Sequence, residues 1–119
     1  MRGPRVEILS FEGCPSREAA RAQVLAVAAE LGVEPDLELV QVADPGQAVQ
    51  LRFLGSPTVR VNGRDVEPGA GERDEFALSC RVYRTEHGPS GVPDARWLRE
   101  ALGDAAAGSR LGPAPPEGG

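Results

Sequence analysis

Residues 6–17 read VEILSFEGCPSR and hold the change from strand to helix that decides the fold. The apolar run 6–11 predicts a short buried strand, and a helical pattern begins at Pro15. Cys14, one of only two cysteines, stands between the two. A thiol at the start of a helix faces unpaired backbone N–H groups and the positive end of the helix dipole, which favour the thiolate. We therefore expect Cys14 to be a reactive thiol; the alternative is a small buried residue.

The pattern from Pro15 to Leu31 predicts the first helix, with Pro15 in its first turn and Gly32 as its terminator. One face of this helix is apolar and is expected to be buried: Ala20, Val24, Val27, Ala28 and Leu31. Residues 37–42 then alternate like a second strand. A strand, a helix and a strand in succession imply a parallel pair, so the fold class is α/β.

Residues 44–47, DPGQ, predict a second helix that is capped by Asp44 and extends to about Phe53. Residues 58–66 predict a hairpin, because Asn-Gly stands at positions 62–63 between two strand-like runs.

The residues from Pro93 predict a last helix that ends at Gly103. Its Trp97 is expected in the core, as is Phe53 of the second helix. We expect one domain over residues 1–103, followed by a disordered tail rich in Gly, Pro and Ala over 104–119.

Composition excludes several classes of function. A chain of 119 residues has room for one modest core. The formal net charge of −5 argues against a nucleic-acid partner. No run approaches the about 20 apolar residues of a membrane span, and the first residues lack the apolar core of a secretion signal. We expect a cytoplasmic protein with no membrane partner, and the sequence gives no sign of a cofactor.

The segment 67–92 is an insertion, far longer than most connections in a compact domain. Within it, residues 76–83, FALSCRVY, fit a strand with positions 76, 78, 80 and 82 on one face, or a short helix. Cys80 is best explained by burial in this apolar run and is otherwise the second candidate thiol. Arg81 and Arg84 are expected to be solvated, and His87 to lie on a surface loop.

The order β-α-β-α-β-β-α resembles that of small bacterial thioredoxin-like proteins. The motifs that carry the resemblance are FEGCP at 11–15, within a single-cysteine GCPS sequence, and GSPTV at 55–59. The resemblance implies a thioredoxin-like three-layer sandwich with an insertion before the last helix. It also implies a cis bond before Pro57, and that Ser56 and Pro57, with Pro15, bind the substrate backbone beside the reactive cysteine.

One position departs from the pattern of redox-active members. Arg17 stands where these proteins carry the second cysteine of Cys-x-x-Cys, so the resolving thiol must be external or Cys80. Arg17 would then tune the Cys14 thiolate or hold an anionic group such as a carboxylate; the alternative is a solvated residue of the first turn.

The expected function is that of an oxidoreductase that uses Cys14 in thiol–disulfide exchange, or in thiol-based reduction, on a protein or small-molecule thiol or disulfide. A second resemblance, carried by LSCRVY at 78–83, is to proteins discussed alongside alkylmercury lyases. It implies an alternative in which Cys14 and Cys80 bind a soft metal such as mercury, or an organomercurial, as paired thiolates. A third reading is a redox-silent binding module that uses the groove between Cys14 and Pro57.

Overall fold

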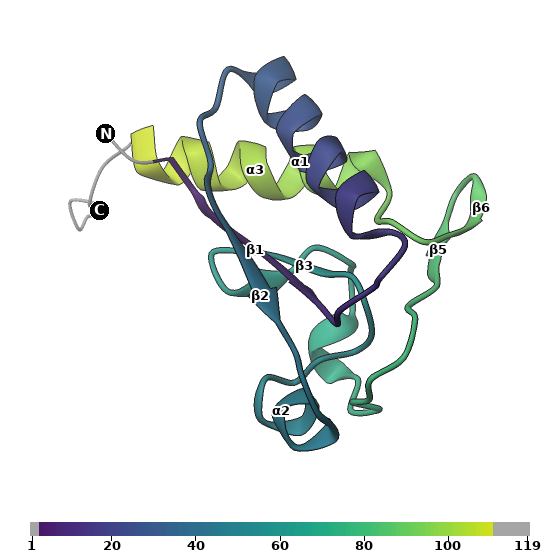
Figure 1. The fold of residues 1–119 in the computed structure, drawn as a ribbon. Coiled ribbons are helices and arrows are strands. Elements are labelled where there is room, and N and C mark those ends of the chain that lie inside the picture. The colour runs from purple at the N-terminus through teal and green to yellow at the C-terminus, as the bar shows by residue number, and fades with distance from the viewer. Residues whose placement is uncertain (1–2, 111–119) are drawn as a thin grey trace.

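The computed structural model describes residues 3–110 and is mixed α/β (Figure 1). Its elements in chain order are β1 (Arg5–Ser10), α1 (Arg17–Leu31), β2 (Asp36–Gln41), α2 (Pro45–Gln50), β3 (Thr58–Val61), β4 (Arg64–Asp65), the 3₁₀ helix η1 (Ala70–Glu72), β5 (Tyr83–Thr85), β6 (Gly88–Ser90) and α3 (Ala95–Arg110).

Four strands form one sheet in the order β2-β1-β3-β4. β1 runs parallel to β2, with Ile8 opposite Leu39, and antiparallel to β3, with Ile8 opposite Val59. β3 and β4 form the hairpin around Asn62 and Gly63. The parallel pair and the hairpin that the sequence predicts are therefore confirmed. β5 and β6 pair as a separate two-stranded sheet within the insertion.

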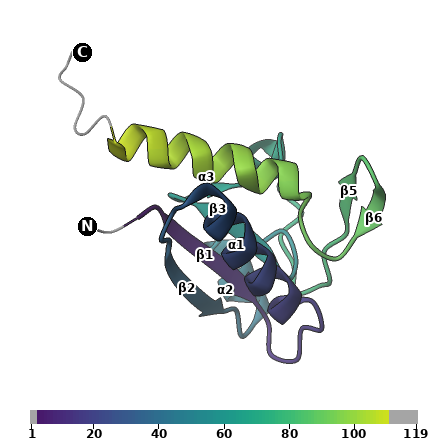
Figure 2. The ribbon, with the colours of Figure 1, turned by 90° about the horizontal axis from the view of Figure 1, so that it is seen from above.

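Helices α1 and α3 lie side by side over one face of the four-stranded sheet (Figures 1 and 2). The main core lies between them and the sheet, and most of it comes from alternate positions of β1 and β3 and from one stripe of each helix. Its buried members are Val6, Ile8, Ala20, Val24, Val27, Ala28, Val59, Val61, Val66, Tyr83, Trp97, Leu98 and Leu102. The core position predicted for Trp97 is confirmed.

The opposite face of the sheet is covered only in part. A small buried cluster of Leu9, Val42, Ala48 and Phe53 joins it to α2, which confirms the predicted burial of Phe53. Asp44 caps α2 by accepting the backbone N–H of Gln47 at 2.9 Å, as the sequence predicts.

Four predicted features of the helices are wrong. α2 ends at Gln50, so Phe53 follows the helix after a turn at residues 51–52. α1 begins at Arg17 instead of Pro15, because residues 15 and 16 form a turn, and Leu31 at its far end is 36% exposed. α3 continues past Gly103 to Arg110. Ala101, Leu102 and Ala105 pack against the core on both sides of Gly103, which offsets the cost of about 1 kcal/mol for glycine in a helix.

The disordered tail predicted for 104–119 is therefore wrong for 104–110, and residues 111–119 lie outside the described part of the chain. Within residues 3–110, no helix combines the length and the apolar character that crossing a bilayer requires.

Candidate functional site

Cys14 lies in the turn that connects β1 to α1. Its backbone N–H donates to the carbonyl of Phe11 at 3.2 Å, and its own carbonyl accepts the N–H of Arg17 at 3.4 Å. The residue is partly buried and its thiol is free. Ser16, not Cys14, is the N-cap of α1, so the prediction that Cys14 itself caps the helix is wrong by two positions. The cysteine nevertheless sits within one turn of the helix start.

Ser56 connects the Cys14 turn to the segment that carries Cys80. Its hydroxyl accepts the backbone N–H of Phe11 at 3.3 Å. On its other side, Ser56 forms a parallel β-bridge with Cys80. In this bridge the Ser56 N–H donates to the carbonyl of Ser79 at 2.8 Å, and the Ser56 carbonyl accepts the N–H of Arg81 at 2.9 Å. One buried serine thus holds the backbones of both cysteine-bearing segments.

The segment 76–83 is extended, and it is neither the helix nor the regular strand that its apolar spacing allows. Phe76 and Leu78 are partly buried, as the predicted strand face requires, but from Cys80 onward the orientation is reversed, because Arg81 and Tyr83 point inward while Cys80 and Val82 are exposed. The prediction that Cys80 is buried is therefore wrong, and so is that of a solvated Arg81. Arg84 is exposed, as the sequence predicts.

The Arg81 side chain is 1% exposed and is surrounded by oxygen acceptors. It bonds both oxygens of Asp65, at 2.7 and 3.1 Å, and one oxygen of Glu67 at 2.7 Å. It also donates to the hydroxyl of Thr58 at 3.1 Å. Burial by itself would lower the pKa of Arg81, but the hydrogen bonds to Asp65 and Glu67 outweigh burial and raise it. Arg81 is therefore a permanent buried cation.

Tyr83 completes the attachment of this segment. Its ring lies under the Arg81 guanidinium, 4.3 Å from centroid to Cζ, and its hydroxyl donates to the carbonyl of Pro57. Gly55 allows the close approach, because a Cβ built on it would lie 2.9 Å from the Cβ of Arg81. Gly55 also has a φ of 124°, which side-chain-bearing residues rarely adopt.

The two residues expected to hold a substrate are covered by this segment. The bond between Ser56 and Pro57 is cis, as the resemblance implied. However, Ser56 is 2% exposed and Pro57 is fully buried. Neither can bind the backbone of a substrate in this structure, because the chain's own residues 79–83 occupy that position. Pro15, the third residue expected to bind substrate, is exposed on the Cys14 turn.

The remaining candidates lie around the start of α1. Arg17 is the first residue of the helix, and its Nε lies 3.8 Å from the carboxylate of Glu18 in a largely exposed ion pair. The loop after β6 passes close by, since a Cβ on Gly91 would lie 2.6 Å from the Ser16 hydroxyl. His87 lies on the β5–β6 turn with its side chain 80% exposed, which confirms its place on a surface loop.

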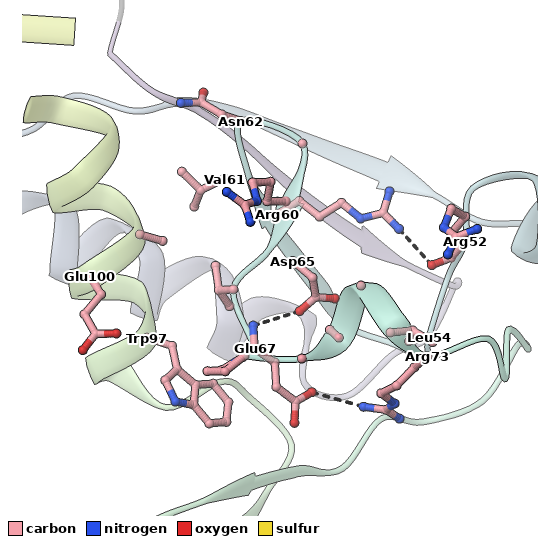
Figure 3. A pocket seen from close by; sticks show the side chains of 18 of the residues that line it. Arg52, Leu54, Arg60, Val61, Asn62, Asp65, Glu67, Arg73, Trp97 and Glu100 are labelled. Atoms are coloured by element: carbon pink, nitrogen blue, oxygen red, sulfur yellow. Dashed lines mark hydrogen bonds and ion pairs between the residues drawn. The ribbon is translucent and has the colours of Figure 1, made fainter. Parts of the chain in front are cut away.

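A hollow of about 690 Å³ lies elsewhere, between α3, the β3–β4 hairpin and η1 (Figure 3). Neither cysteine lines it, and neither does Pro57. Several of its charged side chains already have partners in the protein. Arg73 pairs with Glu67 at 3.2 Å, and Arg60 donates to the Leu51 carbonyl at 2.6 Å. The hollow therefore offers few unpaired charged groups to a ligand, and we take the region around the two cysteines as the candidate functional site.

Sequence reasoning missed the group that positions Cys80, namely Arg81, Tyr83, Asp65 and Glu67. The available signal was a lone arginine within an apolar run, downstream of two acidic residues spaced like neighbours on one face of a strand. Comparison of the chain with protein-family models, with curated proteins and with solved structures found no significant match.

Proposed function

We propose that this chain is a thioredoxin-like protein that carries out thiol–disulfide exchange with Cys14 as the attacking thiol and Cys80 as the resolving thiol. The observation that carries the proposal is the position of Ser56, which bonds the Cys14 turn on one side and the Cys80 segment on the other. Both thiols are free, and Cys80 is exposed although it lies in an apolar run. Burial therefore does not account for Cys80.

The arrangement of the elements supports the thioredoxin-like part of the proposal. The chain begins with β-α-β-α-β-β and ends with a helix, the sheet order is β2-β1-β3-β4, and Cys14 follows the first strand. Helices α1 and α3 share one face, and α2 contributes to a small cluster on the other. These features support our proposal of a thioredoxin-like three-layer arrangement in which the segment 67–92 is an insertion before α3.

The exchange proceeds in two steps. The Cys14 thiolate attacks one sulfur of a disulfide, so that a mixed disulfide forms on Cys14 and one thiolate leaves. The Cys80 thiolate then attacks Cys14 Sγ, which forms a bond between the two cysteines and releases the second thiolate. Two equivalents of a low-molecular-weight thiol reduce this bond and are themselves oxidised to a disulfide. The small thiol thus supplies the two electrons that reduce the substrate disulfide.

Arg17 has a supporting role in the proposal. Arg17 lies at the start of α1, one turn from Cys14; its Nε is buried without a hydrogen-bond partner and lies 3.8 Å from the Glu18 carboxylate. A guanidinium there can bind the carboxylate of an anionic substrate. The Arg17→Met variant should slow reaction with an anionic disulfide such as oxidised glutathione and leave reaction with neutral hydroxyethyl disulfide unchanged.

The test is turnover of hydroxyethyl disulfide with reduced glutathione as the electron donor. Cys14→Ser should abolish turnover. In a single turnover of pre-reduced protein without glutathione, Cys80→Ser should accumulate a mixed disulfide on Cys14, whereas the unmodified chain should form the Cys14–Cys80 bond, and mass spectrometry distinguishes the two products. Ser79→Ala changes an exposed neighbour of Cys80 and serves as the matched control. A Cys14→Ser protein with the turnover of the unmodified chain would overturn the proposal.

A second candidate, soft-metal binding, uses the same two thiols. It is favoured because neither cysteine has a disulfide partner and a pair of thiolates suffices for a metal such as mercury. Residues 3–110 contain no cluster of three or more His, Cys, Asp or Glu side chains that could hold a metal with higher coordination. Under this alternative, Cys14→Ser and Cys80→Ser would weaken mercuric-ion binding equally, and neither protein would need to turn over a disulfide.

A further inference from the structure

The strongest unexplained feature of the site is that the chain covers its own edge. Residues 79–81 pair with Ser56 as a strand would, and they use both its backbone donor and its acceptor. A bound polypeptide needs the same two groups to add a strand at this position. Because Ser56 has one backbone N–H and one carbonyl, and both are engaged within the chain, a second polypeptide can pair there only by displacing residues 79–81.

This displacement is opposed by a buried ionic anchor. Arg81 follows Cys80 directly, and its guanidinium makes four hydrogen bonds to Asp65, Glu67 and Thr58. Removing residues 79–81 from Ser56 would also remove Arg81, which would take the paired cation from Asp65 and leave Glu67 with only Arg73. Breaking a buried pair in this way is strongly unfavourable. Residues 79–81 are therefore a fixed part of the site and not a mobile cover.

The residues directly beside each thiol have short side chains, and Glu12 is the exposed charged residue next in the Cys14 turn. Gly13 and Pro15 are exposed on one side, and Ser79 and Cys80 on the other. The nearby Ser56 and Pro57 are buried. The thiols are thus flanked by short side chains, and the Ser56 backbone groups, which an extended peptide would pair with, are already engaged within the chain.

We infer that the substrate of this site is a small-molecule disulfide and that folded or extended polypeptide disulfides are excluded by residues 79–81. The inference rests on the proposed function, which leaves open a protein or a small-molecule substrate. It selects small-molecule disulfides, because both backbone groups of Ser56 are already hydrogen-bonded within the chain. The sequence predicted that a substrate backbone would bind at Ser56 and Pro57. In the structure, residues 79–81 of the chain itself pair with Ser56.

The test compares two substrates on the full chain, hydroxyethyl disulfide and the disulfides of insulin, with reduced glutathione as the electron donor in both. We expect reduction of hydroxyethyl disulfide and at least a hundredfold lower rate constant for insulin. Comparable rate constants for both would overturn this inference and leave the proposed function standing. Reduction of neither would overturn the proposed function and this inference with it.

A pair of variants tests the cause. Arg81→Met should free residues 79–81 and raise the insulin rate relative to the hydroxyethyl disulfide rate, while Arg84→Met, at an exposed position, should leave that ratio unchanged. Amide hydrogen exchange at Ser56 reports whether the edge has opened. A folded Arg81→Met protein with fast exchange at Ser56 and no gain on insulin would overturn the inference. If this variant does not fold, the comparison of hydroxyethyl disulfide with insulin on the unmodified chain remains the test of the inference.

Discussion

The two segments that carry the cysteines are held in opposite ways. The Cys14 turn is built by near neighbours, since its backbone bonds join residues 11 to 14 and 14 to 17. The Cys80 segment is built by distant ones, because Arg81 bonds Asp65, 16 positions away, and Tyr83 bonds Pro57, 26 positions away. The first segment is local and tolerant of change. The second depends on one buried cation, and we expect it to be the more easily broken.

The largest expected effect on stability comes from replacing Arg81, the buried cation. Arg81→Met removes the cation that Asp65 and Glu67 share in a largely buried setting and leaves Glu67 with only its pair to Arg73, so it should lower the free energy of unfolding by about 3–5 kcal/mol. Urea denaturation measures the change. Arg84→Met, at an exposed position, should remain within about 0.5 kcal/mol of the unmodified chain. Equal effects of the two substitutions would contradict the contrast between an anchored and a solvated arginine.

A glycine-to-alanine substitution in the Cys14 turn and one at Gly55, which contacts the Cys80 segment, sharpen the comparison. Gly55→Ala combines an unfavourable φ with a Cβ 2.9 Å from the Cβ of Arg81, and it should cost about 3 kcal/mol. Gly13→Ala has a φ of 83° but no atom within 4 Å of its added Cβ, so only backbone strain of about 1 kcal/mol remains. Thermal unfolding of the two variants ranks them. A Gly13→Ala protein that is less stable than Gly55→Ala would refute the close contact.

Tyr83 makes the stability of the folded protein depend on pH in the alkaline range. Burial raises the pKa of Tyr83 above its usual value of about 10, so the unfolded chain releases this proton at lower pH than the folded one. The stability from the neutral phenol is thus complete below about pH 10 and is lost as pH rises further. We expect Tyr83→Phe to lose about 1–2 kcal/mol at neutral pH, because the Pro57 carbonyl loses its donor.

The check on Tyr83 is urea denaturation at about pH 8 and about pH 11, flanking the ordinary tyrosine titration. The unmodified chain should lose more stability between the two conditions than Tyr83→Phe does. Because the chain has one tyrosine, phenolate absorbance reports this residue alone. A normal titration of the absorbance in the folded protein would contradict the burial of the hydroxyl.

The smallest effect is expected at the Cys14 turn. Arg17→Met removes an ion pair in which the two side chains are 42% and 69% exposed, so stability should change by less than about 0.5 kcal/mol. Denaturation midpoints for Arg17→Met and for the neighbouring Arg21→Met should coincide. A loss as large as that of Arg81→Met would mean that the Cys14 turn is also anchored, and the contrast between the two segments would fail.

The sequence by itself determined the parts of the molecule that depend on short-range pattern. The β1–α1–β2 unit follows from apolar periodicity, the cap of α2 from Asp44, and the β3–β4 hairpin from Asn62-Gly63. These features arise within a few residues, where side-chain type and backbone conformation are directly linked. The position of Cys14 between strand and helix belongs to the same class.

Only the tertiary structure decided the inward face of the segment 76–83 and the exposure of Cys80. Apolar spacing favoured burial of Cys80 and Val82. The carboxylates that pair with the buried Arg81 lie 14 and 16 positions away in the sequence, and local periodicity cannot predict such a pairing. Once Asp65 and Glu67 lie beside β3, burying Arg81 becomes favourable and the segment turns over by one residue. That reversal accompanies the pairing of the Cys80 backbone with Ser56 and leaves the Cys80 side chain exposed.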